Sequence, residues 1–242
     1  RRRVLVDHQR ERLELAGIAR RQGDPHRDGH NRGVLGARGH FNADKPGAID
    51  ERPPLEDVIG KRRPGIAGVS RNKRVQAFGG GKNHMVVLPD ADLDLAADAA
   101  VSAAYGAAGQ RCMAASAMVG VGNVDHIIQK ICEEAKKIVP GKNLGAVISK
   151  EAKERIEKYI TEAEQEGAKI LIDGRGARVE GKEKGTYVGP TVIDYVKPDM
   201  AVAREEIFGP VLSIMRTETV DEAIAIENKN PYGNAASVFT QN

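Results

Sequence analysis

Aromatic residues are scarce in this chain of 242 residues, where they make up 4% of the sequence and include no Trp. Proteins that bind single-stranded nucleic acid commonly stack the bases on aromatic side chains. A stacking platform for nucleobases is therefore not expected, and we predict no nucleic-acid partner.

Long apolar runs and cysteines are also scarce. No uninterrupted apolar stretch reaches the roughly 18 residues that a membrane span requires, and the charged N-terminus lacks the apolar region of a secretory signal. Two cysteines, Cys112 and Cys132, do not make a disulfide framework. We expect reduced thiols, no membrane association, and a location in the cytoplasm or, in a eukaryote, the mitochondrial matrix.

Basic residues change in kind near residue 74. Residues 1–74 hold 15 Arg and 3 Lys, whereas residues 75–242 hold 6 Arg and 13 Lys. The first segment has little apolar periodicity, which favours a disordered extension or a stretch that is not a natural domain, such as a wrong-frame translation. A basic nucleic-acid-binding arm is the alternative. The glycines of 33–39 lack the spacing of a dinucleotide loop, and no clear strand precedes them.

Residues 75–242 have a regular pattern in which strands alternate with helices. Asp92 and Ser149 are placed to cap helices, and Thr219-Val-Asp-Glu222 is a capping box. This alternation predicts an α/β domain with a mainly parallel sheet and helices on its faces. The predicted helices are 93–105, 124–139, one between Ser149 and Gly167, and 220–228; the predicted strands are 118–121, 169–172, 191–196, 211–215 and 236–240.

Cys112 is the first candidate for chemistry, because it lies on a loop between a helix of small residues and a strand. A thiol is a good nucleophile only as the thiolate, which a cation or backbone dipoles promote. Arg111 is adjacent, although neighbouring side chains often diverge. A small buried hydrophobe is the alternative reading of Cys112, and it is the favoured one for Cys132 on the apolar side of its helix.

Three motifs resemble the aldehyde dehydrogenase superfamily. Gly106-Ala-Ala-Gly-Gln-Arg-Cys112 looks like its catalytic-cysteine signature, Glu205-Glu206-Ile-Phe208-Gly-Pro-Val211 like the second signature, and Asn230-Pro-Tyr-Gly233 like the third. They occur in the family's order, and the resemblance runs from about Arg74 to Asn242. Within the superfamily, three segments look most like the CoA-acylating methylmalonate-semialdehyde dehydrogenases: Lys82-Asn83-His84, Gly109–Ala114 and Asn230–Gly233.

The resemblance implies a mechanism and a set of site residues. Cys112 would be the nucleophile that attacks the aldehyde, its backbone amide one oxyanion donor, and NAD the acceptor of the hydride. Glu206 and Phe208 would contact the nicotinamide ribose and ring, and Arg111 could bind a substrate carboxylate. Lys82 and Asn83 would support the loop, and no metal is expected. The product would be an acyl-CoA made from a short carboxylated semialdehyde.

One residue departs from the pattern of hydrolytic relatives. Those enzymes place a glutamate general base in a Glu-Leu-Gly-Gly-Lys motif, whereas here Phe78 precedes Gly79-Gly-Gly-Lys82. Phenylalanine cannot take a proton from water, so the thiol of CoA would release the acyl group. A hydrolytic enzyme with another base is the alternative.

The resemblance also implies that the catalytic domain is incomplete at both ends. The cofactor-binding half and the Pro-Trp-Asn-Phe segment that supplies the second oxyanion donor have no counterpart in residues 1–74, and relatives continue beyond residue 242. A catalytically inactive fragment is therefore a further alternative. Full-length relatives are expected to be homo-oligomers.

Overall fold

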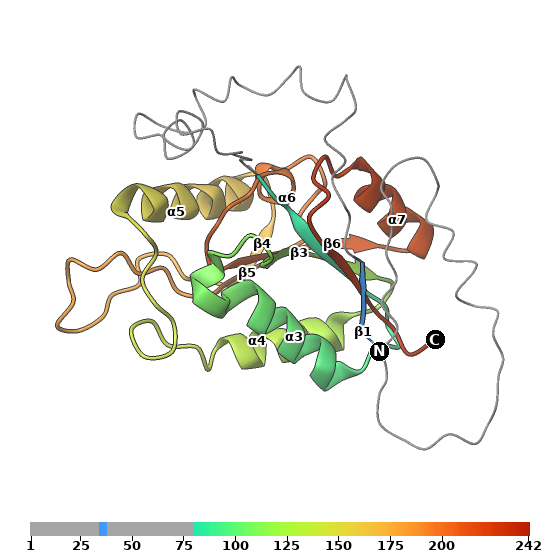
Figure 1. Ribbon diagram of the computed structural model, residues 1–242, viewed down its shortest axis with the longest axis horizontal. Helices are drawn as coiled ribbons and strands as arrows, with labels where there is room; N and C mark the ends of the chain where they lie inside the picture. The colour runs from blue at the N-terminus through green and yellow to red at the C-terminus, as the bar shows by residue number, and fades with distance from the viewer. Residues whose placement is uncertain (1–33, 38–79) are drawn as a thin grey trace, which may run out of the picture. The chain divides into compact units, whose positions relative to one another are not determined.

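The computed structural model describes residues 34–37 and 80–242, and the elements named below belong to one compact unit. Among these residues a seven-stranded sheet has the order β1-β7-β2-β3-β6-β5-β4 (Figure 1). The strands from β7 to β5 run parallel. The two edge strands are antiparallel to their neighbours, β1 to β7 and β4 to β5. The predicted mainly parallel α/β fold is confirmed. The strands are β1 Val34–Ala37, β2 Asn83–Val87, β3 Ala115–Val121, β4 Lys169–Ile172, β5 Thr191–Asp194, β6 Val211–Thr217 and β7 Ala236–Phe239.

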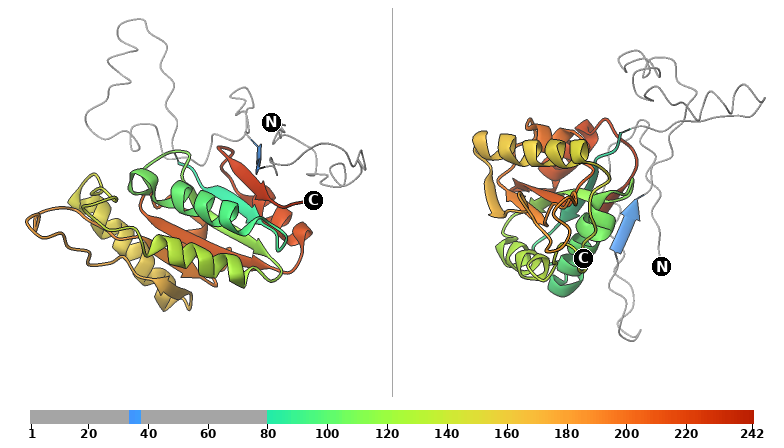
Figure 2. Two further views of the ribbon diagram at one scale, coloured as in Figure 1. Left: turned by 90° about the horizontal axis from the view of Figure 1, so that it is seen from below. Right: turned by 90° about the vertical axis from the view of Figure 1, so that its left-hand side faces the viewer.

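Helices cover both faces of this sheet (Figure 2). Helices α3 (Leu93–Tyr105) and α4 (Asp125–Ala135) pack together on one face. Helices α5 (Lys150–Gln165) and α7 (Val220–Lys229) lie on the other, where the short α6 (Ala201–Arg204) contacts α5. Because both faces are covered, the interior strands β2 and β5 are buried along their whole length.

The predicted helix starts are confirmed by their caps. The Asp92 carboxylate accepts a hydrogen bond from the Leu95 N–H at 2.9 Å, and the Ser149 hydroxyl accepts one from Ala152 N–H at 3.2 Å. Thr219 and Glu222 form the complete capping box. Each cap satisfies N–H groups that the first turn of a helix leaves free, and is worth about 1 kcal/mol.

Some predicted boundaries were wrong by a few residues. The helix predicted over 124–139 ends at Ala135, because Val139 precedes Pro140 and its N–H bonds to the Asn143 side chain in a turn. The strand predicted over 191–196 stops at Asp194, since Tyr195 has a φ of 56°. Strands β3 and β6 are longer than predicted.

Two strands were not predicted. Strand β2 begins with Asn83 and His84, polar residues that the apolar pattern does not assign to a central strand. Their burial is partly compensated, because Asn83 Nδ2 donates to two backbone carbonyls and His84 Nδ1 lies 2.7 Å from Glu227 Oε2. Asn83 Oδ1 and His84 Nε2 have no hydrogen-bond partner among the described residues. Strand β1 lies within the segment 1–74, and the rest of the prediction for that segment lies outside the described residues.

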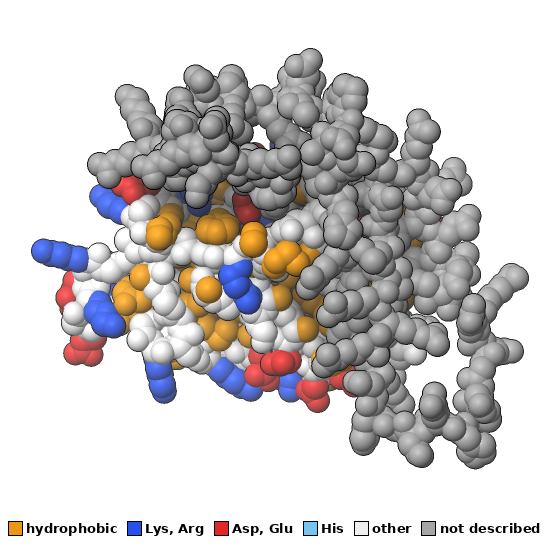
Figure 3. All heavy atoms as spheres, viewed as in Figure 1, with side chains coloured by type: hydrophobic (Ala, Val, Ile, Leu, Met, Phe, Trp, Pro, Cys, Tyr) orange, Lys and Arg blue, Asp and Glu red, His pale blue; other side chains and the backbone are white. Residues whose placement is uncertain are grey.

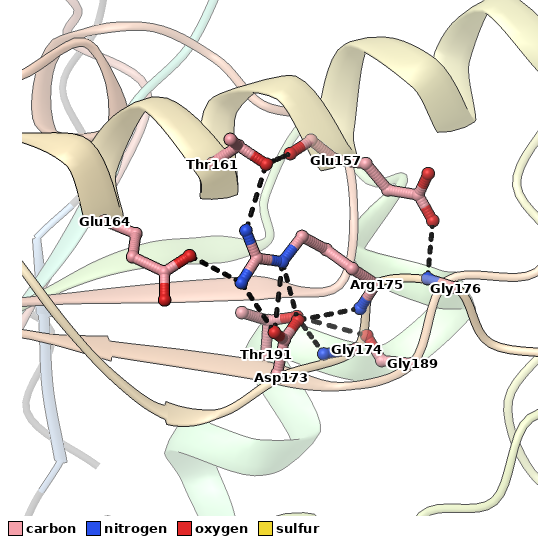
Figure 4. Close-up of polar contacts among 9 residues, drawn as sticks. All are labelled: Glu157, Thr161, Glu164, Asp173, Gly174, Arg175, Gly176, Gly189 and Thr191. Carbon is pink, nitrogen blue, oxygen red and sulfur yellow. Dashed lines mark hydrogen bonds and ion pairs between the residues drawn. The ribbon is translucent and has the colours of Figure 1, made fainter.

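The edge of the sheet at β4 is tied to α5 by Arg175 (Figure 4). Its guanidinium donates to both carboxylate oxygens of Asp173, to Glu164 Oε2 at 2.7 Å and to Thr161 Oγ1 at 3.0 Å. These bonds lower the pKa of Asp173 and raise that of Arg175. The edge strand is thereby held to the helix layer.

Two loops on different elements touch through glycines. A Cβ placed on Gly109 would lie 2.0 Å from the Gly209 carbonyl oxygen, and Gly109 has a φ of +68°. A Cβ on Gly209 would in turn lie 2.5 Å from Ile156 of α5. The loop before β3 and the loop before β6 therefore meet backbone to backbone, with α5 behind them.

We predict that Gly109→Ala separates these loops. The new methyl group must displace backbone, so we expect a loss of roughly 3 kcal/mol or more in the free energy of unfolding, measured by urea titration. Gly176→Ala is the matched control, because Gly176 has the same φ of +68° but no atom within 4 Å of the added Cβ. Its loss should be about 1 kcal/mol. If the two variants lost the same free energy of unfolding, the contact between Gly109 and Gly209 would not be important for stability.

Candidate active site around Cys112

Cys112 lies in a turn between the 3-10 helix η2 (Gly106–Gly109) and β3, and its thiol is free and exposed. Within η2, Ala107 and Ala108 have φ values of 51° and 54°. Left-handed backbone at a non-glycine residue is strained, and such strain is typical of functional sites. The close contact of Gly109 with Gly209 helps to hold this strained backbone of η2 in place.

The carbonyl oxygen of Cys112 accepts hydrogen bonds from two side-chain amides. Asn83 Nδ2 donates to it at 2.9 Å and also to the Ala114 oxygen at 2.8 Å. Asn234 Nδ2 donates to the same Cys112 oxygen. Asn83 was predicted only to support the loop, and Asn234 was not singled out. The one signal in the sequence is its position, directly after Gly233 of the third motif.

Gly81 lies close to residues of two of the motifs and to Asn234, which directly follows the third motif. A Cβ added to it would lie 3.5 Å from Glu206 Oε1, 3.7 Å from Asn234 Nδ2 and 3.8 Å from the Cys112 oxygen. The Gly81 backbone also forms a hydrogen bond with the Glu206 carboxylate, which partly opposes the rise in the pKa of that group caused by burial. The structure therefore brings Glu206 next to the loop of Cys112.

Glu206 and Phe208 lie on the loop between α6 and β6, and both are half-buried. Burial is the largest influence on Glu206 and raises its pKa despite the nearby Lys82. Phe208 has a φ of 53°. Helix α5 supports the loop, since Arg155 Nη2 donates to the Ile207 oxygen at 3.3 Å and the Tyr159 hydroxyl donates to Glu205.

Arg111 turns toward the end of α3. Its Nη2 donates to the Ser102 oxygen at 2.7 Å and to the Ala103 oxygen at 2.9 Å. A cation at the last carbonyls of a helix is stabilising. Arg111 therefore caps the C-terminal end of α3. Its binding of a substrate carboxylate stays a prediction.

Lys82 is almost completely buried, at 2% exposure, beside the Glu206 loop. Its Nζ has no hydrogen-bond partner among the described residues. Burial lowers the pKa of Lys82 to about 7, and the carboxylates of Glu206 and Glu205 only partly oppose this effect. Burial therefore disfavours the charged form of this amine.

Three further predictions concern Phe78, metal ions and membrane association. Phe78 lies outside the described residues. Within residues 34–37 and 80–242, no group of three or more His, Cys, Asp or Glu side chains could hold a metal ion. No helix in the same ranges is long and apolar enough to cross a membrane.

We predict that Lys82→Met removes a pH dependence of stability. Because the pKa of Lys82 is lower in the folded state, the unfolded chain binds more protons between pH 7 and 10.5, and stability rises with pH over this range. A shift of this size corresponds to a few kcal/mol. Urea titrations at several pH values should show the rise in the wild type and in Lys142→Met, an exposed control, but a flatter profile in Lys82→Met. Equal slopes in all three would contradict the prediction.

The chain is similar in sequence and in fold to several known enzymes. The human mitochondrial acylating methylmalonate-semialdehyde/malonate-semialdehyde dehydrogenase is 50% identical over 181 residues, which cover 72% of this chain and 34% of that protein. The chain thus spans about a third of the length of such relatives. The structure of methylmalonate-semialdehyde dehydrogenase from Oceanimonas doudoroffii matches with a TM-score of 0.67 and 41% identity, over 72% of this chain and 37% of that one.

A third relative was solved with a bound cofactor. It is 1-pyrroline-5-carboxylate dehydrogenase from Thermus with bound NAD, which matches with a TM-score of 0.62 and 34% identity over 67% of this chain and 32% of that one. Residues 60–242 match the aldehyde dehydrogenase family, from upstream of Arg74, where the resemblance was expected to begin. This chain belongs to the aldehyde dehydrogenase family.

Proposed function

We propose that this chain is the thiol-bearing part of a CoA-acylating enzyme that oxidises a short carboxylated semialdehyde, with Cys112 as the nucleophile. The observation that carries the proposal is the state of Cys112. Its thiol is exposed, and its backbone N–H donates to no other residue in the described part of the chain. A nucleophile and a free oxyanion donor thus belong to the same residue.

In the proposed reaction the Cys112 thiolate attacks the aldehyde carbonyl carbon and forms a thiohemiacetal. The Cys112 N–H then donates to the oxygen on which negative charge develops. NAD, when bound, supplies the acceptor for the hydride that leaves the former aldehyde carbon, so that a thioester remains on Cys112. The thiol of CoA attacks this thioester, the bond to the Cys112 sulfur breaks, and the thiol of the enzyme is regenerated.

The residues present fit the nicotinamide end of NAD. The half-buried carboxylate of Glu206 could accept hydrogen bonds from ribose hydroxyls, and the half-buried ring of Phe208 lies two residues away on the same loop. The amine of Lys82, which has no hydrogen-bond partner among the described residues, lies close enough to that carboxylate to interact with its charge. The described residues contain no segment with a dinucleotide-binding fingerprint. The adenosine end of NAD would therefore need residues other than these.

Two observations favour CoA over water as the acceptor of the acyl group. The human relative carries the word "acylating" in its name, and Phe78 stands where hydrolytic enzymes have their glutamate base. The hydrolytic enzyme remains the alternative within the family. The inactive fragment remains the alternative outside it, because the chain spans about a third of those relatives.

A nucleic-acid-binding role receives no support from the described surface. On the face shown in Figure 3, basic and acidic side chains are interspersed over the described residues rather than separated into a field of one sign. The Arg-rich segment that suggested this role lies outside the described residues apart from β1. Binding to a polyanion would have to depend strongly on salt.

We predict that p-nitrophenyl propionate acylates Cys112 without NAD. The Cys112 thiolate attacks the ester carbonyl and p-nitrophenolate leaves, so the full chain should give a burst of about one equivalent and an increase in intact mass of one propionyl group. Added CoA should then release the acyl group at least about tenfold faster than buffer does.

Cys132→Ser is the matched control, because Cys132 is the other cysteine and lies half-buried on α4. This variant should keep the burst, whereas Cys112→Ser should lose it. A burst that persists in Cys112→Ser would refute Cys112 as the nucleophile. Release that is equally fast with and without CoA would support the hydrolytic alternative.

We also predict that Arg111 affects carboxylated substrates selectively. Arg111→Gln should slow acylation by the p-nitrophenyl monoester of a dicarboxylic acid by about tenfold, the scale of one charge-assisted hydrogen bond, and leave p-nitrophenyl propionate nearly unaffected. Equal losses with both esters would mean that Arg111 serves only the end of α3.

A further inference from the structure

Both peptide planes that flank the α-carbon of Cys112 are fixed by hydrogen bonds. On the N-terminal side, the plane that contains the Cys112 N–H also contains the Arg111 carbonyl, which accepts from the Ala114 N–H at 3.0 Å. On the C-terminal side, the Cys112 carbonyl accepts from Asn83 and Asn234. Because peptide groups are planar, fixing both planes sets φ and ψ of Cys112.

The two amides reach Cys112 from the starts of neighbouring strands. Asn83 is the first residue of β2, and Asn234 stands just before β7, which runs parallel to β2 with His84 opposite Ala236. A carbonyl oxygen has two lone pairs, so two donors saturate it. The Asn83 amide is itself fixed, because its second N–H is bound by the Ala114 carbonyl.

The start of β2 is held to the same segment by a second bond. Asn230 Nδ2 donates to the Lys82 carbonyl at 2.8 Å, and Asn230 Oδ1 accepts from the Tyr232 N–H at 3.1 Å. The segment from Asn230 to Asn234 therefore contacts both Lys82 and Cys112 through side-chain amides. Its Asn234 contact is the one that reaches the nucleophile.

We propose that Asn83 and Asn234 are positioning residues for Cys112, which hold its carbonyl so that its thiol and its backbone N–H face the same substrate carbonyl. The inference rests on the proposed role of Cys112 as nucleophile. Neither amide touches the reacting atoms. Both act through the peptide of Cys112, and both are neutral donors that add no charge beside the thiolate.

Asn234→Leu tests the inference, because leucine is close in size and neutral but donates no hydrogen bond. Asn234 is only partly buried, so the variant should fold. Two rates are measured on the full chain at the same pH: acylation by p-nitrophenyl propionate, which needs the oxyanion donor, and alkylation of Cys112 by iodoacetamide, which needs only the thiolate. We expect acylation to fall about tenfold, the scale of one lost hydrogen bond, and alkylation to change by less than about twofold.

Two further variants make the result specific. Asn234→Gln keeps an amide donor and should recover part of the acylation rate, whereas Asn228→Leu, on the exposed side of α7, should change neither rate. Thermal unfolding followed by circular dichroism checks that each variant is folded. Unchanged acylation in Asn234→Leu, or a parallel loss of both rates, would overturn the positioning role. If the wild type itself is alkylated but not acylated by the ester, the proposed function fails and this inference fails with it.

Discussion

The candidate site depends on one contact between backbones, that of Gly109 with Gly209. It presses the loop that carries Cys112 against the loop that carries Glu206 and Phe208, and no side chain larger than hydrogen fits between them. Three non-glycine residues of these two loops, Ala107, Ala108 and Phe208, have positive φ values. Each such residue costs about 1–3 kcal/mol, so the packing of the surrounding layers has to hold them in place.

That packing comes from elements that are regular in themselves. The parallel strands are buried between two helix layers, and the α5 residue Ile156 lies directly behind Gly209. Strain at a site can persist only where the neighbouring structure overdetermines it. The regular part of the domain therefore acts as a frame, and the energetic cost is confined to two short loops.

At the start of β2, buried polar groups with hydrogen-bond partners likewise lie beside groups without them. Lys82, Asn83 and His84 are consecutive and all buried. Asn83 bonds to the Cys112 loop and His84 to Glu227, so their burial is partly compensated, although Asn83 Oδ1 and His84 Nε2 lack hydrogen-bond partners among the described residues. The amine of Lys82 has no hydrogen-bond partner there at all. An uncompensated buried amine is expensive and lowers its own pKa instead. Natural proteins accept such costs at functional sites more than elsewhere.

How much the sequence could predict follows from the range of each interaction. The helix starts at Asp92, Ser149 and Thr219 depend on residues three positions apart, and all three were predicted correctly. The sheet class followed from the alternation of strands and helices. Strand β2 escaped prediction because its burial depends on partners up to 143 positions away, and the Asn234 contact with Cys112 spans 122 positions. Local patterns carry no information about such pairs.

The family motifs predicted Cys112, Glu206 and Phe208 as site residues without any geometry, yet they did not say which contacts hold these residues together. The contacts that fix Cys112 all come from residues 81–234, within the described part of the chain. The proposed nucleophile and oxyanion donor therefore have their geometry set by described residues of this chain, whereas the proposed hydride transfer also needs bound NAD. Attack by the thiol and transfer of the hydride should accordingly be separable in this chain, because they depend on different parts of the full-length relatives.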